Sequence, residues 1–261
     1  MLARLQQRWR DWRESAAVAR RPIPDDLWKR TLVRYPFLRQ RSADDAAALR
    51  RMTSLFLDRK EFNAAHGLRL TDDVVVAVAA QACLPVLRLG LAAYDGFVGI
   101  VLHPDQVVAR RAVTDDDGVV HEYDEVLAGE AMEGGPVMLS WRDVRGAGRS
   151  AADAYNVVIH EFAHVLDMAN GVADGTPPLP PGLPLVEWRA VLEREYEAFV
   201  ARVDADEHTA LDPYGAESID EFFAVASEAF FVAPQAMKKE HPALYGVFVR
   251  FYRQDPAASA A

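Results

Sequence analysis

One apolar stretch, residues 157–167, constrains the fold of this chain most, because it carries two histidines and a glutamate among apolar residues. It reads VVIHEFAHVLD and contains the pattern H-E-x-x-H. An α-helix turns about 100° per residue, so His160 and His164 would lie about 40° apart on one face. Both imidazoles can then bind one tetrahedral Zn²⁺. Glu161 can reach a metal-bound water without binding the metal, as a general base must.

The pattern alone does not establish a metal site, because it fixes only three residues and many unrelated helices carry it. The apolar flanks favour a metal site, since histidine and glutamate side chains in an apolar helix are costly to bury without partners. Asp167 could orient a ligand histidine. The alternative role for Asp167 is a polar residue that ends the helix before the turn Asn170-Gly171.

Composition and charge indicate a folded globular protein and exclude some partners. The chain has 261 residues, of which 51% are hydrophobic, enough for a large core. Its net charge of −10 disfavours direct nucleic-acid binding and an anionic membrane surface. The single cysteine, Cys83, excludes an intrachain disulfide and favours a reducing compartment. We therefore expect a cytoplasmic protein.

Residues 2–16 and 74–93 could each be a membrane-associated segment or a helix of the folded protein. The N-terminus is charged and lacks the uninterrupted apolar core of a secretory signal. Its apolar residues recur at helical spacing over residues 2–16, which predicts an amphipathic docking helix. Residues 74–93 are long enough to span a membrane, but they contain Gln81, Pro85 and Arg88. We therefore predict a buried helix that Pro85 ends, and no membrane span.

Hydrophobic periodicity predicts an α+β fold, mainly helical, with a small mixed sheet before the H-E-x-x-H helix. Helices are expected at residues 2–19, 25–33, 43–62, 72–84, 152–170, 186–203, 218–231 and 242–252. Strands are expected at residues 97–102, 119–127 and 136–141. We divide the chain into an N-terminal helical part (1–70), a core (71–255) and a disordered tail (256–261).

The sequence pattern does not identify the third metal ligand. The metzincin pattern H-E-x-x-H-x-x-G-x-x-H is excluded, because position 167 is Asp and position 170 is Asn. A downstream glutamate is required instead, and the candidates are Glu187, Glu193, Glu195, Glu197, Glu217, Glu221 and Glu228. Local rules favour a capping role for Glu221, because Ser218-Ile219-Asp220-Glu221 is a capping box.

A resemblance selects among these glutamates. The segment YGAESIDEFFA at residues 214–224, following the H-E-x-x-H stretch, resembles the Mlc titration factor A family of bacterial zinc metallopeptidases. It also resembles the catalytic domain of anthrax lethal factor, over the metal region only. In both, the Glu before Phe-Phe is the third zinc ligand and the Tyr seven residues earlier lies over the metal. Carried onto this chain, those residues are Glu221 and Tyr214.

Further blocks extend the resemblance to the titration factor family over about residues 20–255. They are residues 79–87, 135–141, 212–216 and 228–231. The resemblance implies a zincin-like fold of the gluzincin class, with Zn²⁺ held by His160, His164 and Glu221. It also implies that an edge strand precedes the metal helix, and we expect residues 137–141 to be that strand and to pair with an extended peptide.

The remaining polar residues near the motif have two readings each. Tyr214 could donate a hydrogen bond to the oxyanion that forms during peptide hydrolysis, or it could be a packing residue of the turn at 212–215. Glu228 lies seven residues after Glu221 on the same helix face. It would either bond a ligand histidine or cap a buried polar cluster.

Two classes of function are compatible with these features. The first is a zinc-dependent peptidase with Glu161 as general base, an aminopeptidase being one option. The second is a binding protein that sequesters a DNA-binding transcriptional repressor of glucose-uptake genes, with a structural or vestigial zinc site. The titration factor family is associated with both. A structural zinc site usually has four protein ligands, whereas this chain offers three and a catalytic Glu, which favours an enzyme.

Overall fold

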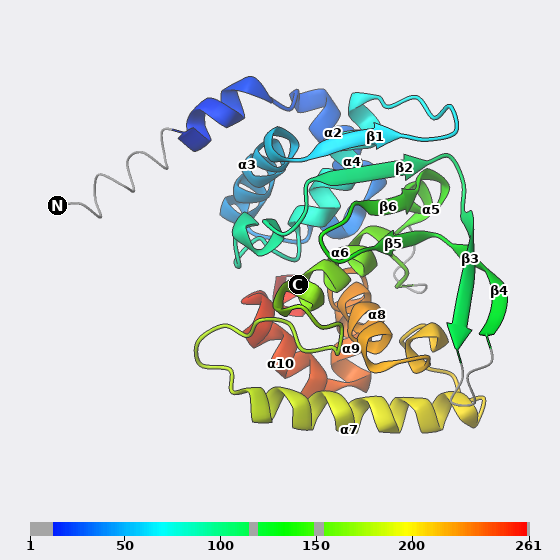
Figure 1. Ribbon diagram of the computed structural model, residues 1–261. Coiled ribbons are helices and arrows are strands. Elements are labelled where there is room, and N and C mark those ends of the chain that lie inside the picture. Colours follow the sequence, from blue (N-terminus) through cyan, green and yellow to red (C-terminus); the bar gives the residue numbers. More distant parts are fainter. Residues whose placement is uncertain (1–12, 115–119, 149–153, 260–261) are drawn as a thin grey trace.

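The helices form two groups in a computed structural model that describes residues 13–114, 120–148 and 154–259 (Figure 1). Helices α2 (Asp25–Arg34), α3 (Ala43–Arg59) and α4 (Asp72–Cys83) lie in the upper half of the molecule, together with a small sheet. The second group lies in the lower half and comprises α7 (Leu185–Asp204), α8 (Ile219–Val232), α9 (Pro234–Glu240), α10 (Pro242–Tyr252) and the short α11 (Pro256–Ser259). The predicted α+β class is confirmed.

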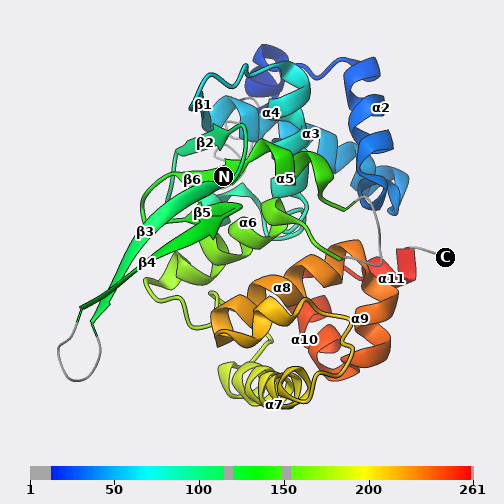
Figure 2. The ribbon, with the colours of Figure 1, turned by 90° about the vertical axis from the view of Figure 1, so that its right-hand side faces the viewer.

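The sheet has four strands in the order β1-β2-β6-β5. Strands β1 (Glu61–Ala64), β2 (Gly99–His103) and β6 (Val137–Ser140) are parallel, and β5 (Gly129–Ala131) pairs with β6 in the antiparallel sense. A separate antiparallel hairpin of β3 (Val107–Thr114) and β4 (Val120–Leu127) projects from the sheet (Figure 2). The sheet is therefore small and mixed, as predicted.

Helix α6 (Val157–Asp167), which carries H-E-x-x-H, lies between the two helical groups. It packs against α8 on one side and against α4, β5 and β6 on the other. Its inner face is anchored by Phe162, whose ring contacts Phe56, Tyr94 and Phe97 at centroid distances of 5.7, 5.0 and 5.7 Å. Burial of such aromatic rings contributes about 1.5–3 kcal/mol each. The metal motif is therefore held in the centre of the core.

Most predicted elements are present, with corrections at their ends. The metal helix begins at Val157 and not at residue 152, because the Asn156 side chain caps it by accepting from the Ile159 N–H at 3.0 Å. The helix predicted over 43–62 ends at Arg59, since Phe62 belongs to β1. Residues 13–20 are helical, and the earlier part of the predicted N-terminal helix lies outside the described residues.

Two further predictions are wrong. Residues 137–140 are not an edge strand, because β6 pairs with β2 on one side and with β5 on the other. Residues 256–259 are not disordered but form α11, in which the Ala257 N–H donates to the Tyr245 hydroxyl at 2.9 Å and its carbonyl accepts from Gln235 at 2.8 Å. Residues 260–261 lie outside the described residues.

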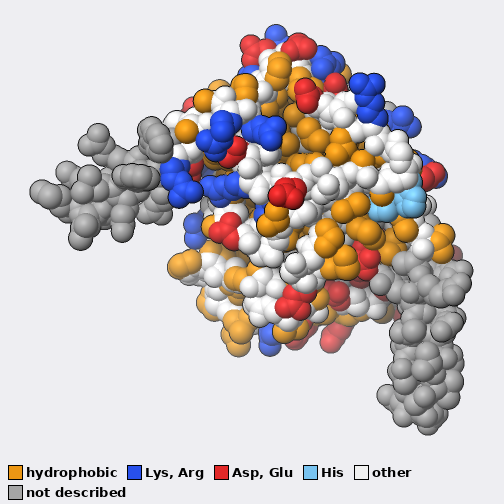
Figure 3. Space-filling model, turned by 45° about the horizontal axis from the view of Figure 1, so that its top comes forward, with side chains coloured by type: hydrophobic (Ala, Val, Ile, Leu, Met, Phe, Trp, Pro, Cys, Tyr) orange, Lys and Arg blue, Asp and Glu red, His pale blue; other side chains and the backbone are white. Residues whose placement is uncertain are grey.

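The two edges of the sheet have different surroundings. Beside β1 lies a groove of about 650 Å³, lined by residues of the 20–24 connector, β1 and α4. Hydrophobic side chains gather in the middle of the upper face of the molecule, with Lys and Arg side chains beside them (Figure 3). Strand β5, the other edge, faces the metal motif.

Within the described residues, no helix combines the length and the apolar character needed to cross a membrane.

Candidate metal centre

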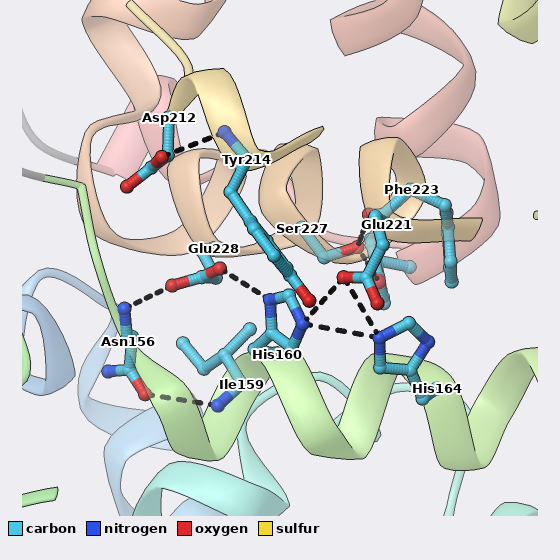
Figure 4. Close-up of polar contacts among 11 residues, drawn as sticks. Asn156, Ile159, His160, His164, Asp212, Tyr214, Glu221, Phe223, Ser227 and Glu228 are labelled. Atoms are coloured by element: carbon cyan, nitrogen blue, oxygen red, sulfur yellow. Dashed lines mark hydrogen bonds and ion pairs between the residues drawn. The ribbon is translucent and has the colours of Figure 1, made fainter. Parts of the chain in front are cut away.

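The predicted ligands come from two helices that pack side by side. His160 and His164 lie one turn apart on α6, and Glu221 lies in the first turn of α8 (Figure 4). Glu221 Oε2 is 3.0 Å from His160 Nε2 and 3.4 Å from His164 Nε2, and the two Nε2 atoms are 3.2 Å apart. The structure therefore brings together the residues that the motif and the resemblance selected.

Glu221 both begins a helix and faces the histidines. Its backbone N–H donates to the Ser218 hydroxyl at 3.4 Å, which is one half of the predicted capping box. Its carboxylate points at the two imidazoles (Figure 4). Burial raises the pKa of Glu221, but hydrogen bonds to His160 and His164 outweigh it and leave the pKa well below its ordinary value. Glu221 is thus an ionised carboxylate aimed at the histidine pair.

The donor set fits a divalent cation. His160 Nδ1 lies 2.8 Å from Glu228 Oε1, and a carboxylate accepts, so the ring proton is on Nδ1 and the Nε2 lone pair faces the site. His164 Nε2 faces the same point, and Glu221 Oε2 is buried there against both imidazole nitrogens. The three ligand atoms lie within 4.8 Å of one another. Converging acceptor atoms require a positive charge between them.

Glu228 is the residue that fixes the orientation of His160. Its Oε1 accepts from His160 and its Oε2 accepts from the Asn156 N–H. The Asn156 amide in turn donates to Gln81 Oε1 at 2.8 Å, and Gln81 donates to the Ala77 carbonyl at 3.0 Å. The side chains of Glu228, Asn156 and Gln81 are buried. Of the two roles left open for Glu228, the structure supports the bond to a predicted ligand histidine, His160, and the chain of bonds tethers the site to α4.

Glu228→Gln tests this positioning role. We expect metal affinity to fall by about 10–100-fold, because the amide is a weaker acceptor for the His160 Nδ1–H than the carboxylate. Metal titration of the purified variant measures the effect. Glu217→Gln, which removes a carboxylate from the turn before α8, serves as the control and should bind metal as the unmodified protein does. Equal affinity in both variants would contradict the role given to Glu228.

The Asp167 side chain bonds the loop after α6 and does not bond a ligand histidine. Its Oδ2 accepts from the Gly175 N–H at 2.8 Å, and its side chain is fully buried. Burial raises the pKa of Asp167 to about 6. Asp167 therefore ties the end of α6 to the loop that follows, which agrees with the alternative reading of a residue at the helix end.

Glu161 lies beside the ligands, in a narrow space against β5. Its side chain is buried, and burial raises its pKa to about 7. A Cβ placed on Gly129 would lie 2.7 Å from the Glu161 Cδ, so any larger residue there would require this carboxylate to move. A carboxylate with a pKa near neutrality is suited to accept and return a proton.

Gly129→Ala should therefore disturb Glu161 more than the ligands. We expect the added methyl group to displace the carboxylate and to lower kcat for the hydrolysis that the family resemblance implies by at least about 10-fold, while the metal content stays the same, because small misplacements of catalytic groups are costly. Gly146→Ala is the matched control, since a Cβ there meets no atom within 4 Å. Unchanged kcat in Gly129→Ala would mean that the position of Glu161 is not limiting.

Tyr214 lies over the site in η4 (Pro213–Ala216). Its ring centroid is 6.0 Å from that of His160, and its hydroxyl end points toward His160 and Glu221 (Figure 4). The turn is fixed by Asp212, whose carboxylate accepts from the Tyr214 N–H at 3.0 Å. The side chain is 40% exposed, so it borders the open side of the site.

Strand β5 forms one wall of a pocket of about 220 Å³ over the ligands, which Tyr214 and Met168 also line. The Ser140 N–H donates to the Ala128 carbonyl at 2.7 Å. In an antiparallel strand the backbone N–H and C=O groups of successive residues face opposite sides, so those of Gly129 and Ala131 point away from β6. These groups face the open edge above the metal motif. The pocket can thus receive an extended peptide beside β5.

Comparison with known proteins places the chain in a family. The model of the glucose-regulated metallo-peptidase M90 family matches residues 9–253. The chain belongs to this family. A protein of Edwardsiella ictaluri named Mlc titration factor A is 38% identical over 224 residues, 85% of each chain. An Mlc titration factor A of Klebsiella pneumoniae subsp. pneumoniae is 35% identical over 88% of this chain and 87% of its own length.

A further relative carries a different name. An uncharacterized protein of Synechocystis sp. is 36% identical over 250 residues, covering 95% of this chain and 90% of its own length. The resemblance to the titration factor family is thereby confirmed, and family membership implies a metallopeptidase-like protein with a divalent metal.

Sequence reasoning did not identify Gly129, Asn156 or Gln81 as parts of the site. Asn156 is the only one of the three with a local signal, because an asparagine directly before an apolar helix is a typical N-cap.

Proposed function

We propose that the protein is a zinc-dependent peptidase of the gluzincin type. The observation that carries the proposal is the convergence of His160, His164 and Glu221 on one point, with the Glu161 carboxylate beside it and an open edge strand along the pocket. Nitrogen ligands and one carboxylate are a zinc donor set, and three protein ligands leave a position for water. Peptides or proteins are the proposed substrates.

Each residue has a proposed role in hydrolysis. His160, His164 and Glu221 would hold the zinc, which when bound acidifies a water and polarises the peptide carbonyl. Glu161 accepts the proton of the attacking water and passes it to the leaving amine. Tyr214 donates a hydrogen bond to the oxyanion. Gly129 and Ala131 hold the peptide by backbone hydrogen bonds along β5.

Metal removal tests the proposal. We expect the purified protein to hydrolyse unstructured peptides, to lose that activity after chelation and dialysis, and to regain it when one equivalent of Zn²⁺ is added, because the general base has no acidified water to deprotonate without the metal. Hydrolysis is followed by mass spectrometry, which also separates endopeptidase from aminopeptidase products. Full activity in protein shown to be metal-free would overturn the proposal.

The names of the relatives favour a second function, in which the chain binds a DNA-binding transcriptional repressor. Protein interfaces commonly bury about 800 Å² per partner, far more than a pocket over a metal site provides. We therefore propose that the repressor binds elsewhere on the surface and that Glu161→Gln retains that binding. A calorimetric titration with the repressor tests this. Loss of binding in zinc-loaded Glu161→Gln would instead make the repressor a substrate in the active site.

The proposed location is the cytoplasm, where such a repressor and its DNA are found. Cys83 is consistent with a reducing compartment, because it is fully buried and burial raises the pKa of its thiol, so it is an unreactive core residue.

A further inference from the structure

A second pocket adjoins the metal site at the far end of β5. It has a volume of about 350 Å³ and shares Met168 with the pocket over the ligands. Met132, which follows the last residue of β5, lines one wall, and Val165, the neighbour of His164, lines another. A peptide that extends along β5 from the metal would therefore reach this pocket with its next side chains.

The second pocket is lined mainly by apolar groups. Ala93, Gly96 and Phe97 come from the segment before β2, and Val165, Met168 and Pro178 come from α6 and the loop after it. Its lining includes one carboxylate, that of Glu133, which disfavours acidic side chains. Burial of a hydrophobic side chain against such an apolar wall is favourable, because it removes apolar surface from water.

The direction of β5 sets which side of the peptide enters the second pocket. Glu161 lies against Gly129 at the start of β5, whereas the second pocket lies beyond Ala131 at its end. Antiparallel pairing is more stable per residue than parallel pairing, so a bound peptide would run opposite to β5. Its residues before the scissile bond then lie toward Met132.

We propose that the second pocket is a specificity subsite that binds a hydrophobic side chain, such as leucine, on the N-terminal side of the scissile peptide bond. This inference rests on the proposed peptidase function and names its substrate class.

The test measures peptide binding by zinc-loaded Glu161→Gln protein, so that hydrolysis is not the readout. Two capped peptides are compared that differ at one position, leucine against glycine. We expect the leucine peptide to bind about 10-fold tighter or more, the range for a filled against an empty apolar pocket. Cleavage-site mapping with the unmodified protein should place leucine before the cut bond.

Gly96→Leu, added to Glu161→Gln, should fill the subsite. The backbone φ of Gly96 lies outside the left-handed region and a Cβ there meets no atom within 4 Å, so leucine is tolerated. We expect the two peptides to bind nearly equally in this variant. Gly246→Leu on α10 is the matched control, because its Cβ is equally unobstructed and far from the pocket lining. Ala93→Leu provides a second filled variant, and bound zinc verifies that each variant is folded.

The outcomes separate the two proposals. A preference for leucine that survives in Gly96→Leu and Ala93→Leu, or no preference in the parent protein, would overturn the subsite and leave the peptidase proposal standing. Binding of neither peptide would also overturn the subsite, whereas the absence of hydrolysis by the zinc-loaded unmodified protein would overturn the peptidase proposal. Leucine mapped consistently after the cut bond would overturn the antiparallel direction and the assignment that depends on it.

Discussion

Glu161→Gln is expected to lower kcat for peptide hydrolysis by about 10²–10⁴-fold while zinc stays bound, because the amide cannot accept the proton of the attacking water. Glutamine has the same shape as glutamate, so it fits the space opposite Gly129 that a Cβ at residue 129 would close. Glu161 is not among the residues whose atoms converge on the metal point. Hydrolysis rates and elemental analysis of the same preparation measure both halves of the prediction.

The control for Glu161→Gln is the Glu130→Gln variant, which changes a neighbouring carboxylate that also lines the pocket. It should retain most of the activity, because Glu130 pairs within the sheet at the register position of Met138 and has no proposed proton-transfer role. Hydrolysis by zinc-loaded Glu161→Gln at the rate of the unmodified protein would remove Glu161 from the mechanism.

Glu221→Ala is expected to lose bound zinc and, with it, peptide hydrolysis. Removing a ligand should weaken zinc affinity by more than about 100-fold, since even residues that only support a ligand contribute about 10–100-fold. The two histidines that remain offer an incomplete donor set. Elemental analysis should show one zinc per chain in the unmodified protein and much less than one in the variant.

Asp220→Ala is the matched control for Glu221→Ala, because Asp220 is the adjacent acidic residue and also lines the pocket. It should keep its zinc. Full zinc occupancy and activity in Glu221→Ala would move the third ligand elsewhere, and Glu228, which already contacts His160, would be the next candidate.

Elements with strong periodicity could be predicted from the sequence, whereas elements defined by pairing could not. Helices α4, α8 and α10 lie within one or two residues of their predicted ranges, because each has a long apolar face. Strand β5 has only three residues and begins with Gly129, so no alternation reveals it. Its antiparallel pairing with β6 is what made the prediction of an edge strand at 137–141 wrong.

Local spacing predicted the two histidines of the site, and the family resemblance added Glu221 and Tyr214. The helical period places His160 and His164 together, and the structure agrees. Local rules favoured a capping role for Glu221, and the packing of α8 on α6 turns its carboxylate to the histidines while its N–H remains in the cap. The contacts of Glu228 with Asn156 and of Gly129 with Glu161 join residues far apart in sequence, so spacing carries no information about them.

Anomalous scattering from a crystal of the zinc-loaded protein, recorded on both sides of the zinc absorption edge, tests the metal centre most directly. The account predicts one strong anomalous peak among His160 Nε2, His164 Nε2 and the Glu221 carboxylate, with Glu161 beside it but not bound to it. A peak elsewhere in the molecule, or no peak in crystals of protein that hydrolyses peptides, would contradict it.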